Sequence, residues 1–303
     1  MDALPEGSGQ AAHPIAEPPF DVREPSGGRF GPVVFASPHS GRCYPDDMRA
    51  ASRLKDLQLR RSEDAYVDEL ISAAPDLGVP LIRARYARAY VDLNRSAAEL
   101  DPSMFIDELP GIPTVRTARV AAGLGAIARV VAEGQEIYAR KLTSRDAAMR
   151  IDGVYRPYHA ALTKLIDQAR TAHGVAILLD WHSMPSAAAR AAPGPGGCDI
   201  VLGDRYGAAC DGLLTRRVEH WLQQCGYRVA RNAPYAGGFT TEHYGAPRRG
   251  VHALQIELNR ALYMDETTLT PRDGLEELRK NLAHLTEQLA QADWSDLRHA
   301  RTT

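Results

Sequence analysis

Short apolar runs alternate with helical patterns along most of the chain, which is typical of an α/β fold. The apolar runs are predicted to be buried strands, because they are only a few residues long and do not alternate with polar residues. They lie at residues 33–36, 79–82, 89–93, 175–179, 200–202, 227–230 and 253–258. Strands that are apolar throughout predict a mixed, mostly parallel sheet flanked by helices on both faces.

Helical patterns fill the intervals between the predicted strands. We expect helices at residues 47–74, 115–149, 152–172 and 207–224. Near the end of the chain, leucines recur at intervals of three and four residues: Leu275, Leu278, Leu282, Leu285 and Leu289. This spacing places them on one face of a helix that should pack against the core.

The chain of 303 residues is long enough for one large α/β domain. We expect that domain at residues 29–293. Residues 1–28 are rich in proline, glycine, alanine and glutamate, so they are predicted to be a flexible lead-in. Residues 294–303 are predicted to form a C-terminal tail.

Charge and cysteine usage exclude several classes of protein. Lysine plus arginine is 36 and aspartate plus glutamate is 38, so no broad basic field is available for nucleic acid. No apolar run approaches the roughly 18 residues that span a bilayer, and the first residues lack a secretory signal. The four cysteines form no CxxC pair. We therefore expect a cytoplasmic protein with reduced thiols that binds neither membranes nor nucleic acid.

Polar side chains stand at the ends of three predicted strands. His39 follows the first strand, His182 follows residues 175–179, and Glu257 lies at the end of residues 253–258. The carboxyl ends of parallel strands share one edge of a sheet, where ligands bind. Two imidazoles and a carboxylate match the ligands of catalytic zinc. Each histidine is also compatible with a structural hydrogen bond, and Glu257 with either a buried ion pair to Arg260 or another arginine, or the role of general base.

The acidic helix start around residues 62–64 offers a third ligand. Asp64 is the first candidate if its side chain turns inward, and Glu63 is the alternative. The plainer interpretation is that Ser62 caps the helix and both acids favour its first turn. Four arginines within residues 83–95 are either a solvated edge or a group that grips a carboxylate. Two glycine-rich segments, 194–197 and 235–239, are predicted to be turns near the site.

Seven segments together carry a resemblance to a known family. They are SPHSGRCYP (37–45), SEDAYVDEL (62–70), RYARAYVDLNR (85–95), LLDWHSMP (178–185), DIVLGDRYG (199–207), YAGGFTTEHYG (235–245) and HALQIELNRALYMDE (252–266). With these segments the chain resembles the N-formylglutamate amidohydrolase family, which is similar to zinc carboxypeptidase-like hydrolases and to the aspartoacylase and succinylglutamate desuccinylase group. The resemblance implies a phosphorylase/hydrolase-like, zinc carboxypeptidase-like fold. One departure is that Arg42, and not a glutamate, stands three residues after His39.

The resemblance also implies the roles of individual residues. One Zn²⁺ per chain would be bound by His39, Asp64 and His182, with Glu63 as the alternative to Asp64, and another divalent ion is compatible. Glu257 and Arg88 would be catalytic, as general base and as partner of the developing oxyanion. The substrate would be held by Arg88, Asn94, Arg95 and Arg260. Asp180 and Asn259 would orient ligands.

The implied reaction is the hydrolysis of N-formyl-L-glutamate to L-glutamate and formate, the last step of one route of histidine breakdown. The partner would be a small acidic N-acyl amino acid, and the protein a monomer or a small homo-oligomer. Two other functions stay open. One is a zinc hydrolase of another N-acyl amino acid or a short peptide, and the other is a metal-free, non-catalytic dicarboxylate-binding protein.

Overall fold

The computed structural model describes residues 18–298 except residues 29, 110, 112 and 195. The strands of its central sheet are β1 (Phe20–Arg23), β2 (Val33–Ser37), β3 (Leu81–Ala84), β4 (Ala176–Met184), β5 (Ile200–Gly203), β6 (Val229–Arg231) and β7 (Val251–Asn259). They are ordered β1-β3-β2-β4-β7-β5-β6 across the sheet. Neighbouring strands run parallel except for β1 with β3 and β5 with β7. The predicted α/β domain with a mostly parallel sheet is confirmed.

Helices cover both faces of this sheet, as predicted. They are α1 (Asp46–Ala51), α2 (Asp56–Arg60), α3 (Val67–Leu70), α4 (Ala118–Ala121), α5 (Ser144–Arg150), α6 (Arg156–His173), α7 (Ser186–Arg190), α8 (Gly212–Gln224), α9 (Phe239–Tyr244) and α10 (Gly274–Gln291). On β2, Val34 and Ala36 belong to the core beneath α6, whereas Val33 and Phe35 belong to the core beneath α3, α8 and α10. The inner strands β2, β4, β5 and β7 are therefore buried on both faces, which explains their apolar runs, whereas the edge strands β1 and β6 are partly exposed.

Shorter elements complete the fold. Turns of 3-10 helix lie at Pro75–Leu77, Pro102–Met104, Ala132–Gly134, Pro247–Arg249, Arg260–Leu262 and Ser295–Leu297, and a π-helical turn at Ile151–Tyr155 joins α5 to α6. A small separate sheet pairs β8 (Met264–Asp265) with β9 (Thr270–Pro271). In α10, four of the five predicted leucines are fully buried and Leu275 is partly buried, so the predicted leucine face is confirmed.

The single helix predicted over residues 47–74 is wrong, because the segment is divided into α1, α2 and α3. Ser52 and Lys55 adopt extended backbone between these helices, and Tyr66 has a left-handed backbone with a φ of 66°. The break before α3 brings the chain against the end of β2, where the Asp64 N–H donates to the His39 carbonyl at 3.0 Å. The interruption of the helix therefore places Asp64 beside His39.

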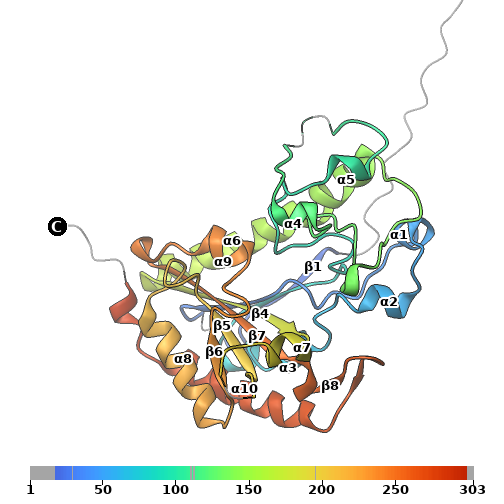
Figure 1. Cartoon of the computed structure of the whole chain (residues 1–303). Helices are drawn as coiled ribbons and strands as arrows, with labels where there is room; N and C mark the ends of the chain where they lie inside the picture. Colours follow the sequence, from blue (N-terminus) through green and yellow to red (C-terminus); the bar gives the residue numbers. More distant parts are fainter. Residues whose placement is uncertain (1–17, 29, 110, 112, 195, 299–303) are drawn as a thin grey trace, which may run out of the picture.

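The strand predicted at residues 89–93 and the helix predicted at residues 115–149 are also wrong. Apart from α4, the start of α5 and short 3-10 turns, the described residues between β3 and α5 are irregular. Many of their apolar side chains are buried nonetheless, because the segment forms its own layer against α6 (Figure 1). Scattered hydrogen bonds hold the backbone, such as the one from the Asp92 N–H to the Ala126 carbonyl at 2.7 Å. Burial without a regular element explains both errors.

The folded part extends beyond both predicted boundaries. Residues 20–23, inside the expected lead-in, form β1 and pair with β3. Trp294 and Leu297, inside the expected tail, are each only 3% exposed and pack in the core beside α10. Residues 1–17 and 299–303 lie outside the described residues. No helix in the described part of the chain combines the length and apolar character that crossing a membrane requires.

Candidate active site

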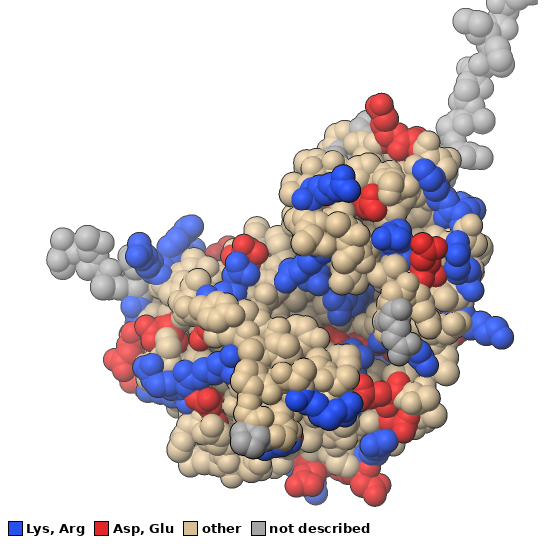
Figure 2. Space-filling model, in the orientation of Figure 1, with Lys and Arg blue, Asp and Glu red and all other residues tan. Residues whose placement is uncertain are grey.

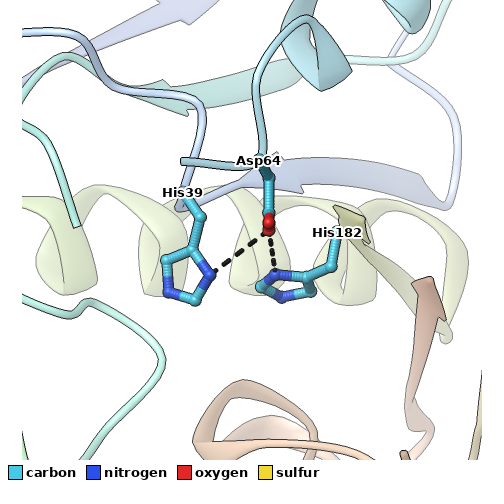
Figure 3. Close-up of side chains that lie close together, drawn as sticks. All are labelled: His39, Asp64 and His182. Atoms are coloured by element: carbon cyan, nitrogen blue, oxygen red, sulfur yellow. Dashed lines mark hydrogen bonds and ion pairs between the residues drawn. The ribbon is translucent and has the colours of Figure 1, made fainter. Parts of the chain in front are cut away.

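His39, Asp64 and His182 converge on one buried point although they come from distant parts of the sequence. His39 follows β2, Asp64 precedes α3, and His182 lies on β4 (Figure 3). One ligand atom of each residue lies within 4.8 Å of the other two. Asp64 Oδ2 is 2.9 Å from His182 Nδ1 and 3.4 Å from His39 Nδ1. Two imidazoles and one carboxylate oxygen in this arrangement form a candidate metal centre.

The outer nitrogen of each imidazole faces a second carboxylate. His39 Nε2 is 2.8 Å from Asp92 Oδ1, and His182 Nε2 is 2.9 Å from Asp180 Oδ2. Because an ionised carboxylate only accepts hydrogen bonds, the contact with Asp92 assigns the N–H of His39 to Nε2 and leaves a lone pair on its Nδ1, whereas His182 faces a carboxylate through both ring nitrogens. His39 Nδ1 is buried and has no hydrogen-bond partner among the described residues. These are the features that a cation at the centre requires.

Charge and hydrogen bonding within the cluster favour a cation there. Burial raises the pKa of Asp64, but the adjacent imidazoles of His182 and His39 outweigh it and hold that pKa well below its usual value. Burial lowers the pKa of His182, whereas Asp180, Asp64 and Glu257 raise it well above the ordinary range. Three carboxylates therefore draw positive charge toward these imidazoles, in the form of a proton or of a metal ion.

Contacts between the segments around His39 and Asp64 fix the position of His39. Ser40 Oγ donates to the Asp64 carbonyl at 3.2 Å, in addition to the backbone bond between Asp64 and His39. Gly41 lies so close to the Tyr86 carbonyl that a Cβ at this position would overlap it. Only glycine allows the two segments to approach in this way.

Glu257 lies beside the candidate metal centre on the neighbouring strand. In the register of β4 with β7 it stands opposite His182, and its side chain accepts a hydrogen bond from Gln255 Nε2 at 2.8 Å. Burial and the nearby Asp64 raise the pKa of Glu257 to about 7, although His182 and Arg88 act in the opposite direction. A carboxylate that titrates near neutral pH is suited to move protons.

Glu63 points away from the candidate metal centre. Its carboxylate accepts a hydrogen bond from Tyr44 Oη at 2.7 Å and pairs with Arg60 Nε at 3.2 Å. Among the described residues, the cluster with metal-ligand spacing contains Asp64 and not Glu63. The geometry therefore favours Asp64 over its alternative.

Two of the residues expected to hold substrate have partners within the protein. Asn94 Nδ2 is 3.1 Å from His182 Nε2, and its Oδ1 accepts the Thr240 N–H at 2.7 Å. Arg260 donates to Asp64 Oδ1 at 3.0 Å. Asn259 caps the turn after β7 by accepting the Ala261 N–H, so it does not orient a ligand of the cluster.

Arg88 and Arg95 face the site from the irregular segment after β3. Arg88 Nε donates to Asp92 Oδ2 at 2.9 Å, so Asp92 holds both this arginine and His39. Arg95 donates to the main-chain carbonyls of Leu124 and Asn94. Burial lowers the pKa of Arg95. The neighbouring cations Arg88 and Arg119 lower it further, whereas Asp92 raises it. The segment thus gathers cations next to the candidate metal centre.

The candidate metal centre, Glu257 and the nearby arginines line one cavity of about 770 Å³. Its ionisable lining includes three carboxylates, Asp64, Asp92 and Glu257, and six arginines, Arg61, Arg88, Arg95, Arg119, Arg205 and Arg260. Tyr235 to Gly238 of the predicted glycine loop border it, whereas Gly194, Gly196 and Gly197 are not among its lining residues. Figure 2 shows the molecule hollowed beneath the part that carries α4 and α5, with blue Lys and Arg side chains in and around the hollow.

Several of these residues were not predicted. Asp92 lies within the segment RYARAYVDLNR (85–95). Its position two residues before Asn94 does not indicate that it contacts both His39 and Arg88. Arg61, Arg119 and Arg205 stand in segments whose sequences resemble ordinary helix ends and turns. Only the folded chain brings these three arginines to the cavity.

The fold and the site define a class: a single-domain α/β protein with two histidines and a carboxylate at the strand ends, a buried glutamate beside them, and a cationic cavity. This set of groups is typical of metal-dependent hydrolases of small acidic molecules.

Comparison with known proteins gives the family. The chain belongs to the N-formylglutamate amidohydrolase family, whose model matches residues 31–264. A protein from Pseudomonas putida named N-formylglutamate deformylase is 29% identical over 277 residues, covering 89% of this chain and 96% of the relative. A protein of the same name from Pseudomonas aeruginosa is 30% identical over 240 residues, covering 78% and 83%. The crystal structure of N-formylglutamate amidohydrolase from Ralstonia eutropha JMP134 superposes with a TM-score of 0.85 at 37% identity, covering 91% of this chain and 98% of that one.

Proposed function

We propose that this protein is an enzyme that hydrolyses the formamide of N-formyl-L-glutamate to L-glutamate and formate, the reaction that ends one route of histidine degradation. The observation that carries the proposal is the convergence of His39, Asp64 and His182 on one point beside Glu257. Relatives that match most of the chain bear the name of this activity.

The donor set fits a zinc ion held by His39 Nδ1, His182 Nδ1 and Asp64 Oδ2. Both Nδ1 atoms face Asp64 Oδ2, and the buried His39 Nδ1 has no hydrogen-bond partner among the described residues. When bound, zinc lowers the pKa of water and polarises a carbonyl group. Asp92 and Asp180 keep the two imidazoles in the orientation that this binding requires.

Glu257 would act as the general base and then as the general acid. Its ionised carboxylate takes a proton from the attacking water and later delivers it to the nitrogen of the leaving amino group. The hydrogen bond from Gln255 Nε2 holds one carboxylate oxygen and leaves the other available for this transfer. The buried surroundings keep competing water away from the shuttled proton.

The arginines would recognise the two carboxylates of the substrate. Six arginines against three carboxylates leave the cavity lining with excess positive charge, although the whole chain carries a formal charge of −2. Arg88 pairs with Asp92 and lines the same cavity as the candidate metal centre, so it would share the negative charge that develops on the formyl oxygen. Removal of one such donor typically costs about 10²- to 10³-fold in kcat.

Formate release from N-formyl-L-glutamate by the purified protein tests the proposal. We expect turnover that is lost after dialysis against a chelator and restored by zinc. Full turnover by protein shown to be metal-free would contradict the metal-dependent mechanism. Binding of N-formylglutamate that stabilises the protein without product would instead indicate a non-catalytic dicarboxylate-binding protein.

The size of the cavity favours a second candidate function, the hydrolysis of amino acids that carry a longer acyl group. A volume of about 770 Å³ lies in the range that holds drug-sized ligands, so it exceeds what a formyl amino acid fills. The two candidate functions are distinguished by comparing kcat/KM for the N-formyl, N-acetyl and N-succinyl derivatives of glutamate and aspartate. A higher value for a longer acyl group would show that the formyl compound is not the preferred substrate.

A further inference from the structure

The two oxygens of the Asp64 carboxylate have different surroundings. Oδ2 faces the imidazoles of His39 and His182. Oδ1 faces the other way and accepts hydrogen bonds from Arg260 Nη2 at 3.0 Å and from Ser183 Oγ at 3.2 Å. The side chain is 1% exposed, so water does not replace these partners. Rotation of the carboxylate would break a buried, charge-assisted hydrogen bond.

The Arg260 guanidinium is itself held on several sides. Nη2 also donates to the Glu63 carbonyl at 2.9 Å, and Nε donates to Ser183 Oγ at 3.0 Å. Nη1 donates to the Arg61 carbonyl at 3.3 Å. The side chain starts directly after β7 and reaches both the end of β4 and the segment before α3. It therefore joins the three elements that carry Glu257, His182 and Asp64.

We propose that Arg260 is a positioning residue that presents a single oxygen of Asp64 to the candidate metal centre, and that it does not bind substrate. The proposal rests on the proposed function, because it assumes that the centre binds a metal ion. A carboxylate that offers one oxygen fills one coordination position, and a catalytic site needs a free position for water or substrate. With its donors directed to Asp64, Ser183 and two carbonyls, Arg260 is occupied by the protein.

The experiment measures zinc affinity by competition with a chelating indicator in the absence of substrate, and KM separately. For Arg260→Gln we expect zinc affinity to fall by about 10- to 100-fold, the usual effect of losing a residue that orients a ligand. KM for N-formylglutamate at saturating zinc should stay close to that of the wild type. Arg260→Lys should recover part of the affinity, because an ammonium group can replace only some of the contacts.

Arg119→Gln is the matched control, since Arg119 lines the same cavity without contacting Asp64. It should show the opposite pattern, with unchanged zinc affinity and a raised KM. If Arg260→Gln fails to fold by circular dichroism, Ser183→Ala removes the other donor to Oδ1 and should weaken zinc binding in the same direction but less.

Two outcomes would overturn the role of Arg260. One is wild-type zinc affinity with a raised KM in Arg260→Gln, which would make Arg260 a substrate-binding residue. The other is wild-type affinity in both Arg260→Lys and Ser183→Ala. A wild-type protein that binds zinc but releases no formate contradicts the proposed function alone. A wild-type protein that binds no divalent ion contradicts both.

Discussion

The strand ends and the irregular segment between β3 and α5 supply different parts of the site. His39, His182 and Glu257 stand on or directly after β2, β4 and β7, and all three are buried. Arg88 and Arg95 come from the irregular segment, are partly exposed, and bind a carboxylate or main-chain carbonyls. The sheet holds the atoms that need exact placement, whereas the irregular segment supplies positive charge, which acts over longer distances.

Asp92 connects these two regions. One of its oxygens faces His39 and the other holds Arg88. Burial raises the pKa of Asp92, but Arg88 and His39 outweigh it and keep that pKa well below its usual value, so the group is a stable anion. The comparison therefore predicts distinct effects of mutation in the sheet, in the irregular segment, and at the residue they share.

The largest effect is expected at the sheet. Glu257→Gln keeps the shape and the hydrogen bond from Gln255 but cannot accept a proton. We expect kcat to fall by about 10³-fold, because general base catalysis contributes about 10²- to 10⁴-fold, while zinc affinity is retained. Formate release and zinc titration measure the two quantities. Glu276→Gln on the exposed face of α10 is the control, and wild-type turnover in Glu257→Gln would remove Glu257 from the proton path.

The pH dependence of the wild-type enzyme follows from the same residue. The ionised carboxylate is the active base, so kcat/KM should fall as the pH drops and Glu257 takes up a proton. Burial raises the pKa of Glu257 to about 7, and a nearby cation shifts the acidic limb below that value, because it favours the carboxylate. Below the limb, the rate should fall about tenfold per pH unit. An unchanged acidic limb in the residual activity of Glu257→Gln would assign it to another group.

The next effect is expected at the connection between the regions. In Asp92→Asn the amide oxygen can still accept a hydrogen bond from His39 or Arg88, but the negative charge that holds both side chains is lost. We expect zinc affinity to fall by about 10- to 100-fold together with a rise in KM, because Arg88 is released. Among the described residues the carboxylate of Asp180 has one hydrogen-bond partner, His182, so Asp180→Asn should weaken zinc binding without raising KM. Identical behaviour of the two variants would show that Asp92 does not link metal binding to substrate binding.

The two regions also differ in how well their sequences predict them. The strands β2, β4, β5 and β7 are predicted because each contains a short apolar run, and parallel strands bring His39, His182 and Glu257 to one edge. The irregular segment contains equally apolar residues such as Tyr90 and Val91, but they are buried by contacts with α6 that are distant in sequence. A periodicity measured along the chain cannot represent such contacts, so residues 89–93 and 115–149 are assigned to the wrong elements.

Contacts between residues distant in sequence also decide the roles of individual site residues. Asp64 follows from its helix-start motif, but its choice over Glu63 depends on Tyr44 and Arg60, which bind Glu63 and turn it away. The family resemblance implies that Arg260 holds a carboxylate of the substrate. In the structure the carboxylate that Arg260 binds belongs to Asp64. Residue types predict the chemistry of the site, and the partners of each side chain require the fold.

The smallest effect is expected for an arginine of the irregular segment. Arg119 is exposed on α4, and no carboxylate in the described part of the chain forms an ion pair with it. An exposed pair with a substrate carboxylate is worth up to about 1 kcal/mol, which corresponds to roughly fivefold in KM for Arg119→Gln. Initial rates at low ionic strength provide the measurement, since salt weakens this attraction.

N-formylglutamine shows whether Arg119 contacts one carboxylate or only adds to the field of the cavity. If Arg119 contacts the side-chain carboxylate of the substrate, Arg119→Gln should raise KM for N-formylglutamate and leave KM for N-formylglutamine unchanged. If both KM values rise by similar factors, the charge attracts the remaining carboxylate as well, and the irregular segment acts through its summed positive charge. The second result would extend the contrast with the strand ends, because the recognition of substrate would then depend on how many arginines line the cavity more than on where each one points.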